Sequence, residues 1–577
     1  MRKYGSDLVV DLLRAYDIPY VPMNPGASFR GLHDSLVNWG TGGPEMIICT
    51  NEKIAVNMAH GYAKVTGRPL AAIVHDVVGL MQGTMGLYTS YVDQVPVLVL
   101  GGTGPMAVGK RRPHIEWVHT AFPQGGLVRD FVKWDDQPFD AQGVVDGFAR
   151  GYQVATTEPG GPVYMCYDVA YQEEPLDDEP EIVVHRSGPD QQFPAAPEVL
   201  LDLADALLQA ERPVIVAGRV GRHRAAAEAL ASLAEMTGTP VVDQGWRFNL
   251  ATNHPLRTAP ATAMTDADLV LALDVVDLYG SVTAPNGGRG SERRWLPAAD
   301  ARLIEMRLDL LEGNGWLPKF QKYQQVDSSI MANTALALPA LLPIVERRRT
   351  ELGRDDAVRR RVEQWTGTNA ERRRQAQEKA RESWDDTPIS TARLAGELWD
   401  IVRGEDFVHT GANLNGWTTR LWDLDDWSQH PGRSLGTATQ IGTSMGVALA
   451  HRDSSTKVVV NIQPDGDLLF DPGTLWTIAH YGLPMLIVMF NNRAYYNDWE
   501  HQAEIARDRG RDITRAHIGL DLDAPAPDFA AMAASFGIES TGPVSDPAKL
   551  GAVLQRAFAT VRDQRRPVLV DVITQHR

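Results

Sequence analysis

The chain has 577 residues, a length that predicts about three to four domains, and its 44% hydrophobic content is that of an ordinary globular protein. The net charge is −17 and no basic block occurs, which argues against a nucleic-acid partner. No apolar run approaches the roughly 18 residues of a membrane span. Cys49 and Cys166 both lie beside apolar segments, so we expect buried, reduced thiols in a cytoplasmic protein.

Three blocks of the chain, residues 1–180, 195–345 and 386–577, each alternate strand-like and helix-like segments. This pattern predicts three parallel-sheet α/β domains. An acidic, proline-containing linker over Glu173–Pro194 separates the first two blocks. A charged connector, residues 346–385, precedes the third block; its helical patterning predicts a solvated helix, with arginine clusters on a wet surface.

The first block begins with an amphipathic helix and contains a short buried strand over Met46–Cys49. A helix then begins at Lys53 and ends at Gly67. Glu52 therefore lies where a strand ends and a helix begins, on the edge of a parallel sheet where ligands bind. On local grounds alone, a glutamate here is most often a dipole partner or a cap of the helix.

A second strand, Leu70–Val74, is followed directly by His75, and a third covers Pro96–Leu100. Glycines 79, 83 and 86 follow at helical spacing, and we expect them to allow close packing against a cofactor or a neighbouring subunit. The turn Asn24-Pro25-Gly26 follows an earlier strand. His75 is a candidate acid–base group, with a purely structural role as the alternative.

The middle block contains four expected strands, 212–218, 240–244, 267–273 and 303–306. Gly218-Arg219-Val220-Gly221 follows the first of them. This is a weak glycine pattern that short turns explain equally well.

The third block carries the most informative stretch. Lys457–Ile462 is a buried-strand pattern, Asp465-Gly466-Asp467 reads as a polar turn, and a helix is expected from Asp471-Pro472 to about Tyr481. Met485–Phe490 is the next strand, followed at once by Asn491-Asn492.

Parallel strands joined through a helix end on the same edge of a sheet, so Asp465 and Asn492 should lie side by side. Carboxylate, amide and backbone oxygens suit Mg²⁺ when a phosphate completes the coordination, and the helix N-terminus near Pro472 favours that phosphate. Taken singly, Asp-Gly and Asn-Asn are also common turn and strand-exit dipeptides.

The stretch from Asp465 to Asn492 resembles the diphosphate–metal motif of thiamine-diphosphate (ThDP) enzymes, although Pro464 stands where the family usually has its first glycine. The segment NEKIAVNMAHGYAKVTGRP, which contains Glu52, resembles the first-domain glutamate motif of the same family. The resemblance extends over essentially the whole chain. It implies three domains that bind the pyrimidine ring, carry a nucleotide-type fold, and bind the diphosphate.

The resemblance also implies roles for individual residues. Glu52 would hydrogen-bond to N1′ of the aminopyrimidine and make its amino group basic. Ile441 would bend the cofactor, and the Thr439 carbonyl would accept from the amino group. Mg²⁺ would be held by Asp465, Asn492 and the Ala494 carbonyl. Further diphosphate contacts are expected from Asn413, Leu414, Asn415, Gly466 and Asp467.

Substrate contacts are expected from the benzoylformate decarboxylase and acetolactate synthase branches. A histidine at the place of His75 contacts the substrate in the former branch. That branch also has a serine where this chain has Ala27, with Ser28 one position further. The remaining candidate contacts are His114, Gln124, Tyr496, Trp499 and Glu500.

The implied reaction is cleavage or formation of a C–C bond next to a carbonyl, by a 2-oxo-acid decarboxylase or an acetolactate-synthase-like carboligase. The polar cluster around Glu500 looks closer to 2-hydroxyacyl-CoA lyases, so that activity stays open, as does a non-catalytic ThDP-binding subunit. We expect a homodimer or homotetramer in which Glu52 lies across a subunit boundary from Asp465. Some family members hold FAD or ADP in the central domain; here we expect it to be empty.

Overall fold

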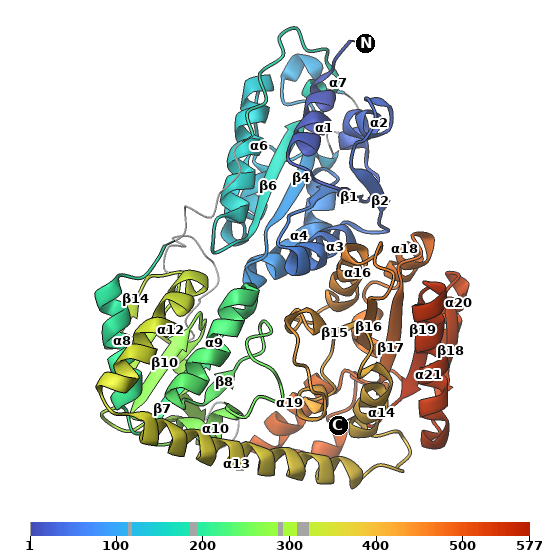
Figure 1. The fold of residues 1–577 in the computed structure, drawn as a ribbon. Coiled ribbons are helices and arrows are strands. Elements are labelled where there is room, and N and C mark those ends of the chain that lie inside the picture. Colours follow the sequence, from blue (N-terminus) through green and yellow to red (C-terminus); the bar gives the residue numbers. More distant parts are fainter. Residues whose placement is uncertain (1, 113–117, 185–192, 287–291, 309–321, 577) are drawn as a thin grey trace.

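The computed structural model of the protein describes residues 2–112, 118–184, 193–286, 292–308 and 322–576. Three α/β domains follow one another along the chain, an N-terminal, a central and a C-terminal one (Figure 1). Each is built on its own sheet of parallel strands. The predicted fold class is thus confirmed.

The N-terminal sheet has six strands in the order β2-β1-β3-β4-β6-β5. Helix α3 (Glu52–Thr66) begins at Asn51, whose side chain accepts from the Lys53 amide, and ends at Gly67 with a left-handed φ of 69°. The strands are β1 (Tyr20–Met23), β2 (Glu45–Ile48), β3 (Ala71–Val74), β4 (Val97–Thr103), β5 (Trp134–Asp136) and β6 (Pro162–Asp168), and the helices include α1 (Gly5–Ala15), α4 (Asp76–Asp93) and α6 (Ala141–Thr156).

The central sheet has the order β14-β13-β10-β7-β8-β9, and a short antiparallel pair accompanies it. Its inner strands β7 and β10 are apolar and buried, as expected for a sheet covered on both faces. They are β7 (Pro213–Ala217), β8 (Val241–Asp243), β9 (Arg257–Thr258), β10 (Leu269–Leu273), β13 (Arg302–Met306) and β14 (Ser328–Ile330), packed with helices α8 (Pro197–Gln209), α9 (Arg224–Thr237) and α12 (Thr334–Glu351).

The C-terminal sheet has the order β15-β16-β17-β19-β18. Its strands are β15 (Phe407–Gly411), β16 (Val458–Pro464), β17 (Met485–Asn491), β18 (Glu539–Val544) and β19 (Val568–Ile573), and its helices include α14 (Thr391–Val402), α16 (Gln440–Ala450), α18 (Thr474–His480) and α21 (Pro547–Gln564).

Two local predictions in this domain were wrong. Asp465-Gly466-Asp467 is not a plain turn but begins a helical turn, α17 (Asp465–Leu468), because the Leu469 amide reaches back to the Asp465 carbonyl. The following helix begins at Thr474 rather than at Pro472, since the chain first makes turns through residues 471–473.

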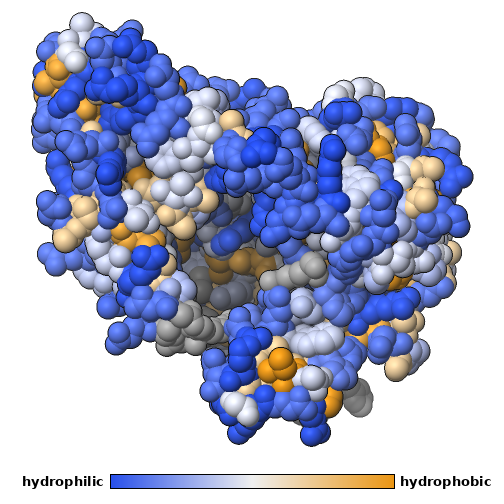
Figure 2. All heavy atoms as spheres, turned by 90° about the horizontal axis from the view of Figure 1, so that it is seen from below, coloured by the Kyte–Doolittle hydropathy of each residue, from blue (hydrophilic) through white to orange (hydrophobic). Residues whose placement is uncertain are grey.

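Most of the connector is the long helix α13 (Asp355–Arg381), which runs along the bottom of the molecule from the central to the C-terminal domain (Figure 1); residues 346–351 are the end of α12. Seen from this side, the surface is mostly hydrophilic and has a hollow near its middle (Figure 2). The expectation that all arginines of the connector are solvated was wrong. Arg361 is 8% exposed and donates to the Ala210 carbonyl, because the helix lies against the central domain.

The N- and C-terminal domains share one hydrophobic core, in which α3 packs on α16. The helices approach closely at glycines: a side chain at Gly446 would lie 2.1 Å from the Met58 carbonyl oxygen. The N-terminal and central domains meet at Asp93, whose buried carboxylate lies 2.8 Å from His60, 2.7 Å from Lys64 and 2.5 Å from Arg247.

Both cysteines are free and buried, as predicted, and burial raises the pKa of Cys166 to about 12. Within the described ranges, the chain has no helix that is both long and apolar enough to pass through a bilayer.

Candidate functional site

The carboxyl ends of β16 and β17 bring the predicted metal ligands to one place. The strands are parallel neighbours with Pro464 opposite Phe490, so Asp465 and Asn492 both leave the sheet at the same edge. The Asp465 carboxylate accepts from the Gly466 amide at 2.8 Å, and the nearby backbone amides of Arg493 and Ala494 act to lower its pKa. The carboxylate of Asp465 therefore lies against the segment that begins with Asn492.

The state of the Asp465 side chain fits a bound cation. The residue is 3% exposed, and its buried Oδ2 has no hydrogen-bond partner among the residues that the structure describes. Burial raises the pKa of this carboxyl to about 6, against the opposing effect of the backbone amides. A divalent ion at Oδ2 would compensate the buried charge.

No group of three His, Cys, Asp or Glu side chains that could hold a metal occurs among the residues that the structure describes. An ion at this edge would therefore need amide and carbonyl oxygens and an anionic ligand in addition to Asp465. That donor set is one that Mg²⁺ accepts when it is bound together with a phosphate.

Strained backbone is concentrated around the same edge. Of the ten non-glycine residues with positive φ among those described, five lie on the loops at this end of the sheet: Leu414, Asn415, Thr437, Ala438 and Arg493. Left-handed conformations of such residues are held by their surroundings and cluster at ligand sites. The buried Asn415 Nδ2 and Gln440 Oε1 also lack hydrogen-bond partners in the described chain. These loops thus resemble a binding cradle rather than ordinary connections.

In the first of these loops, Leu414 is fully buried, whereas Asn413 is exposed and accepts from the Gly416 amide at 3.1 Å. The three predicted loop residues therefore differ in how accessible they are to a ligand. Asn413 and Asn415 have polar groups available to a ligand, and Leu414 anchors the loop in the core.

Asp467 joins the two halves of this edge. Its carboxylate accepts from the Ala438 amide at 2.5 Å and from Gln463 Nε2 at 3.1 Å. These bonds fix the loop that leads into α16, where Thr439 is the N-cap and Ile441 is fully buried in the first turn. The Asp467 carboxylate is thus already hydrogen-bonded by the protein. It would therefore influence a cofactor indirectly, by fixing this loop.

Gly466 is required by a close approach. A side chain there would lie 2.5 Å from the ring of Tyr495, the residue after Ala494. This contact again joins the ends of β16 and β17. Any larger residue at position 466 would push the two segments apart.

Glu52 is the first residue of α3, and it is 5% exposed. The capping bond of this helix is made by Asn51, so the capping alternative does not describe Glu52. Gly79 of α4 faces the carboxylate, because a side chain at that position would lie 2.6 Å from Glu52 Oε1. Glycines 79, 83 and 86 also pack closely on residues of α3 in the same chain; packing against a cofactor or a neighbouring subunit stays a prediction.

The single chain also places residues next to Glu52 against the C-terminal domain. Lys53 Nζ lies 2.9 Å from Asp471 Oδ2, and a side chain at Gly473 would clash with Thr50. These contacts are within one chain. That Glu52 serves the metal site of a partner subunit stays a prediction.

His75 is held between two polar groups. Its Nδ1 lies 2.9 Å from Ser28 Oγ, and its Nε2 lies 3.1 Å from Nδ1 of His119. Since the Asp76 amide donates to Ser28 Oγ at 2.9 Å, the hydroxyl proton can be donated to His75 Nδ1. His75 then carries its proton on Nε2 and donates it to His119. Burial and the neighbouring His119 lower the pKa of His75, so it is neutral at pH 7.

Comparisons with known proteins agree with this geometry. Three models of thiamine pyrophosphate enzymes match in chain order: the N-terminal TPP binding domain over residues 3–121, the central domain over 200–298 and the C-terminal TPP binding domain over 413–572. The chain belongs to the thiamine pyrophosphate enzyme family. It is therefore an enzyme of the acetolactate synthase and benzoylformate decarboxylase type with ThDP-binding domains.

Named relatives of this thiamine pyrophosphate enzyme are distant. The acetolactate synthase large subunit of Lactococcus lactis subsp. lactis is 22% identical, with 93% of this chain and 87% of the relative covered. A benzoylformate decarboxylase of Pseudomonas aeruginosa is 23% identical, with 98% of each chain covered. The structure of a putative thiamin diphosphate-dependent enzyme from Mycobacterium smegmatis superposes with a TM-score of 0.77 at 20% identity, covering 100% of both chains, which shows a shared fold.

The expected substrate residues of this thiamine pyrophosphate enzyme differ in burial and in the groups that they contact. Ala27 is half-buried beside Ser28, which is buried and has its hydroxyl 2.9 Å from His75 Nδ1. Gln124 is 1% exposed and donates to Asp76 Oδ1 at 2.6 Å, which favours a supporting role over substrate contact. His114 lies outside the described residues.

Tyr496 and Trp499 lie on α19 (Tyr496–Asp508), which follows the Asn492–Ala494 segment directly. Both rings pack against His576 near the end of the chain; the Tyr496 and His576 centroids are 4.5 Å apart. Glu500 is half-buried on the same helix. Neither His576 nor His119 was predicted, since a single histidine in an irregular segment has no distinguishing sequence pattern.

The central domain has a cavity of about 890 Å³ at the carboxyl ends of β8 and β10, lined among others by Asp243, Trp246, Asp277 and Arg433. The glycine pattern at 218–221 does not face it as a phosphate loop. Side chains at Gly218 and Gly221 would lie 2.1 and 2.0 Å from the backbone oxygens of Asp274 and Phe248, so close packing explains both glycines. An empty central domain stays a prediction.

Proposed function

We propose that this enzyme uses ThDP and Mg²⁺ to break or form a C–C bond next to a carbonyl, as a 2-oxo-acid decarboxylase or an acetolactate-synthase-like carboligase. The observation that carries the proposal is the buried Oδ2 of Asp465, beside the Asn492–Ala494 segment, which has no hydrogen-bond partner among the described residues. This oxygen supports a cation at the edge where the family resemblance predicts the diphosphate.

The residues present would hold both groups. Asp465, Asn492 and the Ala494 carbonyl would bind Mg²⁺, while Asn413, Asn415 and the segment 465–467 would contact the diphosphate. Glu52 would hydrogen-bond to the pyrimidine ring. When bound, ThDP supplies a nucleophilic carbon and an electron sink for cleavage of the C–C bond.

The side chains of this chain control protons and position. Glu52 is buried, so its carboxylate would act in a low dielectric and hydrogen-bond strongly to a ring nitrogen. Neutral His75 can accept a proton or pass one from Nε2 to His119, and Ser28 fixes the orientation of its ring. Tyr496 and Trp499 would shield the reacting groups from water.

The substrate is proposed to be a small 2-oxo acid, and the support is the names of the relatives, an acetolactate synthase and a benzoylformate decarboxylase. We further propose a homodimer or homotetramer whose active sites combine Glu52 of one subunit with Asp465 and Asn492 of another. A cytoplasmic location, expected from the two reduced cysteines, belongs to the same proposal.

The test is a screen of aliphatic and aromatic 2-oxo acids with the protein, ThDP and Mg²⁺, following release of CO₂ and formation of aldehyde or ligated product. Turnover should require both additions and should be abolished in Glu52→Gln. Cleavage of 2-hydroxyacyl-CoA substrates without turnover of any 2-oxo acid would replace this proposal with the lyase alternative. Turnover by metal-depleted protein would contradict the role of Asp465.

A further inference from the structure

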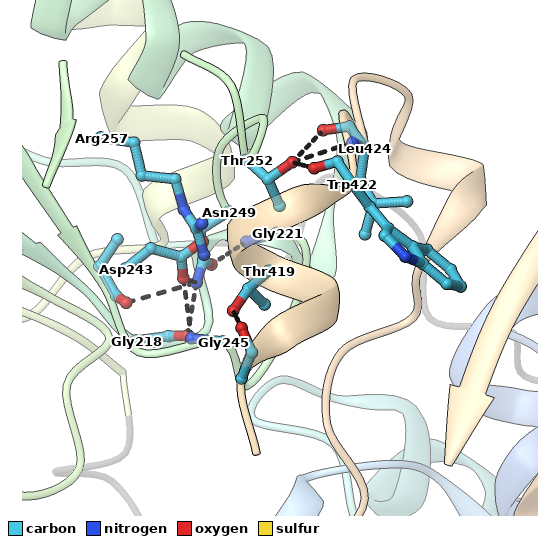
Figure 3. Close-up of polar contacts among 12 residues, drawn as sticks. Gly218, Gly221, Asp243, Gly245, Asn249, Thr252, Arg257, Thr419, Trp422 and Leu424 are labelled. Atoms are coloured by element: carbon cyan, nitrogen blue, oxygen red, sulfur yellow. Dashed lines mark hydrogen bonds and ion pairs between the residues drawn. The ribbon is translucent and has the colours of Figure 1, made fainter. Parts of the chain in front are cut away.

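A second pocket, of about 410 Å³, lies where the central domain, the connector helix α13 and the C-terminal domain meet. Its central-domain wall includes Arg257 and Thr258, α13 contributes Arg372, Arg373 and Lys379, and the C-terminal domain contributes α15 (Trp417–Leu421). The volume is within the usual range for small-ligand sites. The walls are joined by Thr252, which exchanges hydrogen bonds with the backbone of Trp422 and Leu424 (Figure 3).

The lining is strongly cationic, and the one carboxylate among its described residues, that of Asp243, already has protein partners. Figure 3 shows Arg257 directed at Asp243, whose carboxylate lies 3.2 Å from the guanidinium and also accepts from Asn249 Nδ2 at 2.7 Å. Arg373 is paired with Asp423. Each of these two arginines therefore already has a carboxylate partner within the protein.

Three other cations of the lining have no carboxylate partner among the described residues: Arg372, Lys379 and Arg420. Arg372 donates one bond, at 2.8 Å, to the Arg257 carbonyl, and the Arg420 guanidinium lies 4.9 Å from the centroid of the Trp417 ring. Within the described parts of the chain, no protein acceptor is recorded for the remaining donors of these side chains. A guanidinium fork with free N–H groups is suited to phosphate or carboxylate oxygens.

Two further observations favour an anion as the ligand of this pocket. Burial and the neighbouring Arg257 and Arg373 lower the pKa of Arg372, which shows that like charges crowd it. The Thr258 hydroxyl, which lines the pocket on a residue 6% exposed, has no hydrogen-bond partner in the described chain. An anion would relieve the repulsion and accept from the hydroxyl.

We propose that this pocket binds a phosphate-bearing anion, held by Arg372, Lys379 and Arg420, with Trp417 available to stack on a planar group of the same ligand. The site is separate from the proposed cofactor edge and does not depend on it. It is nevertheless connected to that edge, because α15 begins directly after the loop that contains Asn413 and Asn415. A ligand bridging α13 and α15 would stabilise this loop and the contact between the two domains.

The test is calorimetric titration of inorganic phosphate and of phenyl phosphate into the full chain saturated with ThDP and Mg²⁺, so that the diphosphate edge is filled. The wild-type protein should bind at one saturable site. Arg372→Gln combined with Lys379→Gln should weaken binding about tenfold or more, as expected for the loss of charge-assisted hydrogen bonds. Tighter binding of phenyl phosphate would identify an ester of a larger molecule, and equal binding would identify free phosphate.

Arg374→Gln is the matched control. Arg374 is on the same helix, next to Arg373, but its side chain is exposed and paired with Glu371 and Glu378. Its replacement should change the affinity less than twofold. Equal weakening in the control would show diffuse surface charge, and absence of saturable binding by the wild type would also overturn the proposal. If Arg372→Gln fails to fold, Lys379→Gln and Arg420→Gln, both at exposed residues, test the same claim.

Discussion

Gly79→Ala offers the sharpest test of how Glu52 is positioned. The added methyl group would lie 2.6 Å from Glu52 Oε1 and 2.8 Å from the Cβ of His75. Contacts below 3.0 Å are essentially never seen for a Cβ, so the carboxylate must retreat by at least the missing 0.4 Å. The glutamate is the flexible partner and His75 Cβ is not, so the displacement should fall mainly on Glu52.

The expected effect is large on catalysis and small on stability. Overpacking of a buried contact costs about 1–3 kcal/mol, and the better helix propensity of alanine offsets roughly 1 kcal/mol of it. A misplacement approaching 1 Å of a catalytic group lowers rates about 10²-fold. We therefore expect a folded protein with a reduction of roughly 10- to 100-fold in the exchange of the C2 proton of bound ThDP.

The assay is proton–deuterium exchange at C2, measured by NMR after acid quench, together with circular dichroism and urea unfolding. Gly83→Ala is the control one turn along α4, because its methyl group would meet no atom closer than 3.3 Å and would lie 3.7 Å from Glu52 Cβ. It should retain the wild-type exchange rate. If Gly79→Ala exchanged as fast as Gly83→Ala, Glu52 would not act from the position that the structure shows.

Three other predictions concern the subunit boundary, the histidine pair and the domain contact. Mixing inactive Glu52→Gln with inactive Asp465→Ala should restore roughly a quarter of the wild-type activity if each site combines two subunits of a dimer, and none if both residues serve one chain's site. His119→Asn should move the acid limb of the pH–rate profile to higher pH, because His119 helps to lower the pKa of His75 and neutral His75 is the active form; an unmoved limb would contradict the pairing. Asp93→Asn removes the charge that three buried basic groups share. It should lower the free energy of unfolding, measured by urea titration, by about 3–5 kcal/mol. A change below about 1 kcal/mol would count against a structural ion network.

The sequence alone was sufficient to predict the three-domain α/β fold and to predict which residues meet at the edge of the C-terminal sheet. Buried parallel strands are continuous apolar runs, and residues that follow such strands must emerge on one edge, so the neighbourhood of Asp465 and Asn492 follows from local pattern and topology. The family resemblance then predicted a role for Glu52. The boundaries of α17 and α18 were missed because a carboxylate and a glycine in a turn are compatible with either a bend or a helical turn.

Only the tertiary structure decided which side chains face one another across long sequence separations. The pairing of His75 with His119, the burial of Gln124 and the packing of Gly79 on Glu52 depend on how helices and loops of one domain meet. The arginines of the connector show the same limit. Their sequence is that of a solvated helix. The orientation in which this helix packs against two domains places Arg372 in the lining of a pocket and leaves Arg374 exposed. Local sequence fixes which elements form, whereas the direction in which a side chain points depends on contacts made by residues far away in the chain.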